Sequence, residues 1–167
     1  MGLDVSAFSK VENVDDETEI DGTFVRLYLN RSFLERADGL VEGLYSYDKK
    51  VEFRAGSYSA YNAFRDLLAR FALDAPAEDV WKDPGRFHGR PFYELINFAD
   101  NEGTIGPRTS AKLARDFREN AGKAFDFAKA IDKTAHFAGI DEYFVETYQL
   151  FAEAFDLAAD GGAVAFH

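Results

Sequence analysis

The stretch FRAGSYSAYNAFR, residues 53–65, predicts a strand end, a tight polar turn and a helix start within thirteen residues. Gly56 frees the backbone for a sharp turn, and Ser57 or Ser59 is suited to cap the helix that follows. Apolar side chains then recur at the i, i+3, i+4, i+7 spacing of an amphipathic helix. They are Phe64, Leu67, Leu68 and Phe71. We therefore expect the rest of the fold to be organised around this strand-to-helix corner.

The chain before this corner has the alternation of half-buried strands. Residues 5–11 alternate apolar and polar side chains, and residues 24–29 form a second strand candidate. Residues 45–47 and 51–54 are predicted to form a hairpin closed near residues 48–50. Because the connections between these segments are short, antiparallel pairing is favoured.

The chain after the corner is predicted to be mainly helical. Residues 74–91 contain three of the four prolines and are expected to be irregular, and residues 99–107 form a second polar turn. Pro107 suits the first position of a helix, and a last helix is expected from about Gly139 to Ala159. The prediction is one α+β domain over residues 1–167, in which a small, mostly antiparallel sheet from the first half packs against about three helices.

Composition limits the classes of function. Nineteen basic and thirty acidic residues give a net charge of −11, which repels a nucleic acid backbone. There is no cysteine, so disulfides and thiolate chemistry are excluded. No apolar run is long enough to cross a membrane, and no signal peptide is visible. We expect a soluble cytoplasmic protein that binds neither nucleic acid nor membrane.

The standard catalytic and cofactor motifs are absent or incomplete. No G-x-G-x-x-G or Walker loop is present, and the three histidines lack the H-E-x-x-H spacing. A nucleophile elbow around Ser57 would need glycine at positions 55 and 59, where the chain has Ala55 and Ser59. We therefore predict no cofactor and no metal.

Candidate ligand-binding residues gather in the two polar turns and at the end of the sequence. On a helix, Tyr58, Asn62 and Arg65 share one side, where they would form the wall of a pocket for a polar ligand. A structural alternative is favoured, in which Arg54 or Arg65 pairs with an acid of the second turn and joins the two turns. The full candidate set is Arg54, Ser57, Tyr58, Asn62, Arg65, Asp100, Glu102, Thr104 and His167.

Four blocks of sequence together resemble a family of small uncharacterised proteins encoded in bacterial and phage genomes. They are GLDV at residues 2–5, FRAGSYSAYN at 53–62, ELINFADNEGTIGP at 94–107 and ADGGAVAFH at 159–167. The resemblance spans the chain but implies no activity, cofactor or catalytic residue. In that family a glycine often stands at the position of Ala60 and a cysteine at the position of Asn101, so chemistry needing a thiol there would not apply to this chain.

Three kinds of function remain after these exclusions. The first is a binding or interaction module without catalysis, for a small polar ligand or a protein partner. The second is an enzyme acting on a small polar or phosphorylated substrate, with Asp100 or Glu102 as base and Arg54 or Arg65 as the anion partner. The third is an acidic antagonist that uses the last helix, whose residues 141–160 include six acids and no base, against a basic protein. The sequence leaves the oligomeric state open.

Overall fold

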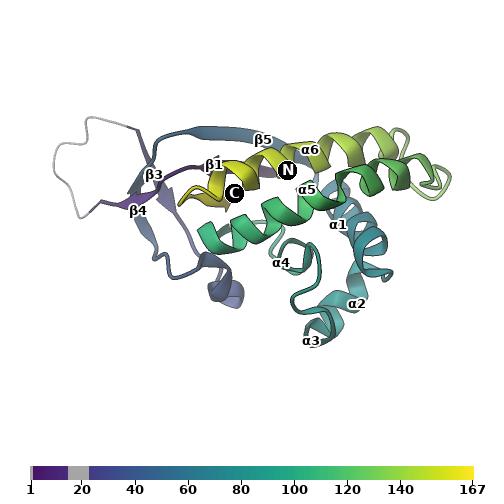
Figure 1. Cartoon of the computed structure of the whole chain (residues 1–167), viewed down its shortest axis with the longest axis horizontal. Helices are drawn as coiled ribbons and strands as arrows, with labels where there is room; N and C mark the ends of the chain where they lie inside the picture. The colour runs from purple at the N-terminus through teal and green to yellow at the C-terminus, as the bar shows by residue number, and fades with distance from the viewer. Residues whose placement is uncertain (1, 15–22) are drawn as a thin grey trace.

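Two antiparallel sheets and a layer of helices make up the fold in the computed structural model, which describes residues 2–14 and 23–167 (Figure 1). The predicted α+β class is confirmed. The strands are β1 (Leu3–Phe8), β2 (Glu12–Asn13), β3 (Phe24–Leu27), β4 (Gly43–Ser46), β5 (Lys50–Gly56), β6 (Gly103–Ile105) and β7 (Ala163–Phe166). The helices are η1 (Arg31–Ala37), α1 (Tyr58–Leu73), α2 (Ala77–Lys82), α3 (Pro84–Phe87), α4 (Tyr93–Ile96), α5 (Pro107–Lys129) and α6 (Ile140–Ala158).

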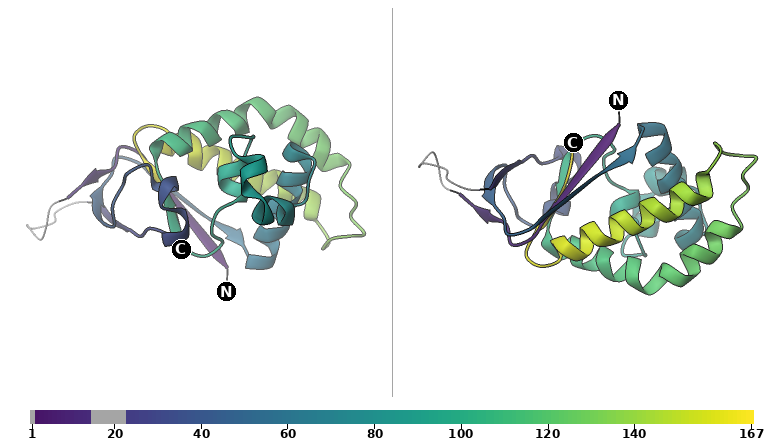
Figure 2. Two further views of the ribbon diagram at one scale, coloured as in Figure 1. Left: turned by 90° about the horizontal axis from the view of Figure 1, so that it is seen from below. Right: turned by 90° about the horizontal axis from the view of Figure 1, so that it is seen from above.

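The larger sheet has the strand order β5-β1-β7-β6, and every pair in it is antiparallel. The first strand of the chain and the last therefore lie side by side in the middle of the sheet, which brings both ends of the chain together (Figure 2). The prediction that the sheet comes from the first half of the chain is wrong for this sheet, because β6 and β7 come from the second half. Pairing of segments so distant in sequence leaves no local signal.

The smaller sheet has the order β2-β4-β3 and lies at the end of the molecule opposite α1 (Figure 1). The predicted hairpin of residues 45–47 with 51–54 does not form, since β4 belongs to this sheet and β5 to the larger one. The physical reason is visible at Ser9. Ser9 and the bend exchange backbone hydrogen bonds, with Asp48 donating to Ser9 and Ser9 donating to Lys49, so the bend docks on the end of β1.

Local capping chemistry fixes the helix starts near the corner. Ser57 caps α1 as predicted, its hydroxyl accepting a hydrogen bond from the Ala60 N–H, and Pro107 stands in the first turn of α5. The α5 N-terminus gains a further cap from Asp38, whose carboxylate accepts bonds from the Thr109 N–H and hydroxyl. Residues 74–91 are more regular than predicted, because α2 and α3 lie within them.

The core is aromatic and lies between the larger sheet and the helices. Phe151 of α6 packs against Phe53 of β5, Phe166 of β7 and Tyr61 and Phe64 of α1. These rings come from four elements, so α6 holds the sheet and α1 together. No helix within the described ranges 2–14 and 23–167 is both long and apolar enough to cross a membrane.

Candidate functional site

The face of the larger sheet that points away from the helices is polar. Cross-strand partners share a face, and the register places Glu52, Ser6, Ala165 and Thr104 in one row across the four strands. A second row follows, in which Asp4 pairs with Arg54 and exchanges both backbone hydrogen bonds with His167. We call this surface the polar face and define it by Asp4, Ser6, Glu52, Arg54, Thr104 and His167. It brings the beginning and the end of the sequence into one site.

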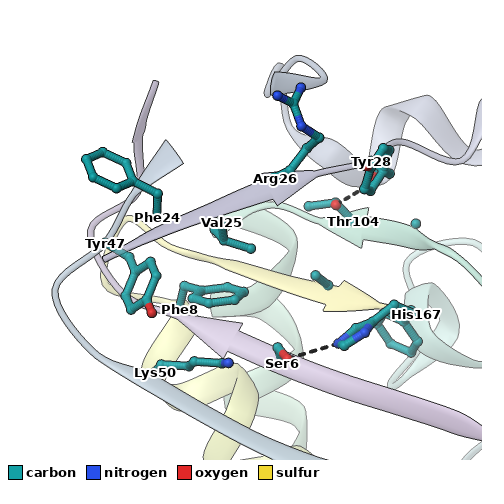
Figure 3. A pocket seen from close by; sticks show the side chains of 13 residues that line it. Ser6, Phe8, Phe24, Val25, Arg26, Tyr28, Tyr47, Lys50, Thr104 and His167 are labelled. Carbon is teal, nitrogen blue, oxygen red and sulfur yellow. Dashed lines mark hydrogen bonds between the residues drawn. The ribbon is translucent and has the colours of Figure 1, made fainter. Parts of the chain in front are cut away.

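A hydrogen bond between Ser6 and His167 lies at the centre of the polar face. The Ser6 hydroxyl oxygen and His167 Nε2 are 3.0 Å apart (Figure 3). Ser6 is buried, whereas His167 is exposed. Within the part of the chain that the structure describes, no side chain forms a hydrogen bond with the second ring nitrogen of His167. The pair therefore has the nucleophile-to-base contact of a hydrolase but lacks the third group that usually orients the base.

A partly enclosed cavity of about 210 Å³ lies beside this pair, between the larger sheet and β3. Its walls are mainly aromatic or aliphatic, and Figure 3 shows them converging from both sheets. Those wall residues are Phe8, Phe24, Val25, Tyr28, Tyr47 and Phe166. Thr104 closes one side, because its hydroxyl donates a 2.7 Å hydrogen bond to the Tyr28 carbonyl and thereby ties β6 to the chain just after β3.

Two cationic side chains border the cavity, but they point in different directions. Lys50 forms an ion pair with Glu52 and lies 5.9 Å from the centroid of the Phe8 ring, with its ammonium directed toward Ser6 in Figure 3. Arg26 extends its guanidinium away from the cavity in the same view. The hydrogen bond and charge of Lys50 lower the pKa of the Glu52 carboxyl, and the charge of His167 acts in the same direction. Lys50, Glu52 and His167 thus form one electrostatic group.

A second, open depression of about 370 Å³ adjoins the cavity on the polar face. It is lined by Asp4, Glu52 and Arg54, and it shares Ser6 and His167 with the partly enclosed cavity. Arg54 is bound within it, because its guanidinium lies 3.3 Å from the Asp4 carboxylate. The two hollows therefore adjoin, one mainly apolar and the other polar, and the Ser6–His167 pair lines both of them.

The predicted pairing of the two polar turns is confirmed for Arg65. This buried arginine lies 3.6 Å from the Asp100 carboxylate and donates hydrogen bonds to the carbonyls of Ile96 and Phe98. Asn62 accepts a hydrogen bond from Arg65 and donates one to Asp100 at 3.2 Å. The rings of Tyr61 and Trp81 each lie 5.0 Å from the guanidinium carbon. Asn62, Arg65 and Asp100 therefore form a brace between α1 and the second turn, and all three line an open hollow of about 420 Å³.

The other candidate residues are divided among different places. Arg54 pairs with Asp4 rather than with an acid of the second turn, and Ser57 is occupied by capping and by a 3.0 Å contact with Ser59. Tyr58 is half-buried, and Glu102 is exposed and fixed through its backbone carbonyl, which accepts a bond from the Asn30 side chain. Only Arg54, Thr104 and His167 of the predicted set line the polar site.

Sequence reasoning missed Ser6, Lys50, Glu52 and Tyr47 as site residues. A signal for three of them was present, because Val5-Ser6-Ala7-Phe8 and Lys50-Val51-Glu52-Phe53 both alternate between the two faces of a strand. Alternation identifies which side chains point to the face of the sheet opposite the core. It does not reveal that β1 lies between β5 and β7, and so it does not place these side chains next to His167.

The structure shows no metal-binding cluster among the described residues, and the comparisons with known proteins add no information on the site. In residues 2–14 and 23–167, no three His, Asp or Glu side chains are grouped so that they could hold a metal ion. Comparisons with protein-family models, curated proteins and solved structures find no match. The resemblance to small bacterial and phage proteins therefore stays a prediction, and the site rests on its own geometry.

Proposed function

We propose that this chain is a binding protein without catalytic activity, whose ligand is a small molecule with an apolar ring and a polar end. The ring occupies the cavity between the two sheets, and the polar end lies in the depression beside Arg54 and His167. The observation that supports this most directly is that the Ser6–His167 pair lines both hollows, which places an apolar and a polar hollow side by side.

The cavity volume limits the size of the ligand. Dry cavities of about 150 Å³ are known to hold benzene, so a cavity of about 210 Å³ suits one aromatic ring with a short substituent. Most ligand sites are larger, on the order of 300–1,000 Å³. A ligand that also extends into the open depression reaches this range, which favours a molecule with two distinct ends.

The side chains at the junction suit hydrogen bonding better than covalent chemistry. Ser6 and His167 together offer a hydroxyl and a ring nitrogen to a ligand amide, alcohol or carboxylate. Because no described side chain orients the second ring nitrogen of His167, binding is favoured over acyl transfer. The ion pairs of Arg54 with Asp4 and of Lys50 with Glu52 balance the charge of the depression, so a neutral or zwitterionic polar end fits it best.

A fragment screen by amide NMR tests this function. The probes are single-ring aromatic compounds that bear an alcohol, amide, amine or carboxylate. Binding is expected to shift the amide signals of Ser6, Thr104 and His167 and to raise the thermal midpoint. Substitution of Ala165, which lines the cavity and is half-buried, by leucine should fill the space and abolish these shifts.

The control is Ala111→Leu, which adds the same atoms on the exposed side of α5. This variant should bind the fragments like the unmodified chain. Equal binding by Ala165→Leu and Ala111→Leu would overturn the assignment of the cavity. A screen in which no fragment shifts the signals of the polar face would overturn the proposed function itself.

A further inference from the structure

A groove on the helix layer has the features of a protein-docking surface, and it is independent of the polar face. Helices α5 and α6 lie side by side (Figure 1), and two hollows of about 370 and 380 Å³ follow the seam between them. Phe125 lines both hollows, so they adjoin along the seam and are treated together as one groove. We call it the α5–α6 groove and define its floor by Ala121, Phe125, Val145, Tyr148 and Ala152.

One rim of the groove is acidic along its length. Glu142, Glu146 and Glu153 are exposed on α6, and none of them has an ion-pair partner among the described residues. Their spacing of i, i+4 and i+11 places them in one stripe beside the apolar floor. Helix α6 contains no basic residue that would neutralise them internally. The remaining acids at the groove, Asp141 and Asp156, pair with Lys133 and Arg118.

The length of the acidic stripe along α6 indicates the length of the helix that could bind beside it. Eleven residues separate Glu142 from Glu153, which corresponds to about 16 Å along the helix axis, or three turns. An amphipathic helix laid in a groove contacts it through apolar side chains at i, i+3 or i+4 and i+7. Its Lys or Arg side chains at one edge would then face the three free glutamates.

We propose that the α5–α6 groove binds a cationic amphipathic helix of another protein. Charge complementarity selects this occupant over the alternatives. A nucleic acid would be repelled by a chain of net charge −11, and two copies packed α6 against α6 would bring rims of the same sign together.

Fluorescence anisotropy with a labelled 16-residue helical peptide of leucine and lysine tests this proposal. The unmodified chain should bind the peptide, and the affinity should fall as salt rises. The double variant Glu146→Lys/Glu153→Lys should bind about tenfold or more weakly, because two attractive contacts become repulsive. The variant Val145→Asp, which alters the floor and not the rim, should also weaken binding at constant salt.

A double variant of matched charge, Glu12→Lys/Glu78→Lys, separates docking from unspecific attraction. Both residues are exposed and lie on β2 and α2, away from the groove. This variant should change the affinity by less than about threefold, a value typical of long-range charge effects screened by salt. Equal weakening by both double variants, or no binding by the unmodified chain, would overturn the proposal. So would sedimentation showing a dimer that Glu146→Lys/Glu153→Lys dissociates, because the occupant would then be a second copy.

Discussion

Replacing Tyr61 by phenylalanine should make this protein more stable. Tyr61 is fully buried, and its hydroxyl has no hydrogen-bond partner among the described residues. Its ring packs near those of Phe64, Phe151 and Phe166. Phenylalanine keeps these ring contacts and removes the hydroxyl, so the core loses a buried polar group and gains no polar group in exchange.

The magnitude follows from two opposed effects. A buried hydroxyl without a partner costs about 1–3 kcal/mol of folding free energy. The guanidinium carbon of Arg65 lies 5.0 Å from the centroid of the Tyr61 ring, and a change of ring alters such a contact by less than its total of about 0.5–2 kcal/mol. The expected net gain is about 1 kcal/mol at pH 7. For a chain of this size that corresponds to a thermal midpoint about 2–4 °C higher.

Tyr148 provides the matched control. It is equally buried, but its hydroxyl donates a 2.7 Å hydrogen bond to the Phe117 carbonyl. Tyr148→Phe removes this bond and should therefore lower the free energy of unfolding by about 1 kcal/mol. The same chemical change is thus expected to have opposite signs at two positions of the same core.

Alkaline pH separates the hydroxyl effect from a packing effect. Burial raises the pKa of Tyr61 above its ordinary value, so the folded state keeps this proton where the unfolded state has lost it. Below about pH 10 both states keep the proton, and the free energy of unfolding does not change through this group. As the pH rises from there through the folded-state pKa, the unfolded state gives up the proton first, and the free energy of unfolding falls by up to about 1.4 kcal/mol per pH unit. The advantage of Tyr61→Phe over the unmodified chain should therefore increase above pH 10.

Urea denaturation followed by far-UV circular dichroism, at pH 7 and at several values above pH 10, measures both effects. A loss of stability in Tyr61→Phe at pH 7 would refute the reasoning, because it would mean that the hydroxyl has a partner in the core. An advantage that stays constant from pH 7 to pH 11 would show that Tyr61 titrates alike in both states.

Three further substitutions should destabilise the fold in the same urea assay. Gly162→Ala would place a Cβ 1.8 Å from the Phe8 carbonyl oxygen, which forces β1 and β7 apart at a cost of about 2 kcal/mol or more. An unchanged urea midpoint would show that the backbone before β7 can move aside without loss of stability. Arg65→Met leaves the carbonyls of Ile96 and Phe98 without their donor and should cost about 1–3 kcal/mol, whereas an unchanged free energy of unfolding would mean that the brace is dispensable. Asp38→Ala removes both hydrogen bonds from Thr109 and should lower the free energy of unfolding by about 1–2 kcal/mol. Asp38→Asn should lower it less, because the amide oxygen can still accept a hydrogen bond. Equal losses in the two variants would assign the effect to the charge of Asp38 and not to capping.

Local chemistry predicted the long helices α1, α5 and α6 and the corner at residues 53–65, but not the short helices α2 and α3. The cap at Ser57, the apolar stripe of α1 and the position of Pro107 all depend on residues within one or two turns, and the structure confirms them. Sheet membership depends on contacts across the whole chain. The bend near residues 48–50 was predicted to close a hairpin. Instead it forms backbone hydrogen bonds with Ser9, and no local sequence pattern indicates that contact.

The contacts of the candidate site also differ in whether the local sequence predicts them. The pairing of Arg54 or Arg65 with an acid of the second turn was predicted because both turns are conspicuously polar, and the structure shows it for Arg65 with Asp100. The contact between Ser6 and His167 joins residues 161 positions apart and depends on β7 lying beside β1. Each strand showed its alternation in the sequence, but the neighbour of each strand could be learned only from the assembled sheet.

The charges of the polar face also restrict what covers it. Arg54 with Asp4 and Lys50 with Glu52 remain substantially exposed, and burying such pairs under an apolar surface would cost more in desolvation than their attraction returns. Whatever binds here must therefore bring polar groups to the depression and apolar groups only to the cavity. Because His167 is held by two backbone bonds to Asp4 in the middle of the sheet, this arrangement exists before any ligand arrives. Ligand binding should consequently stabilise the whole sheet, and not a single loop, in proportion to RT ln(1 + [L]/Kd).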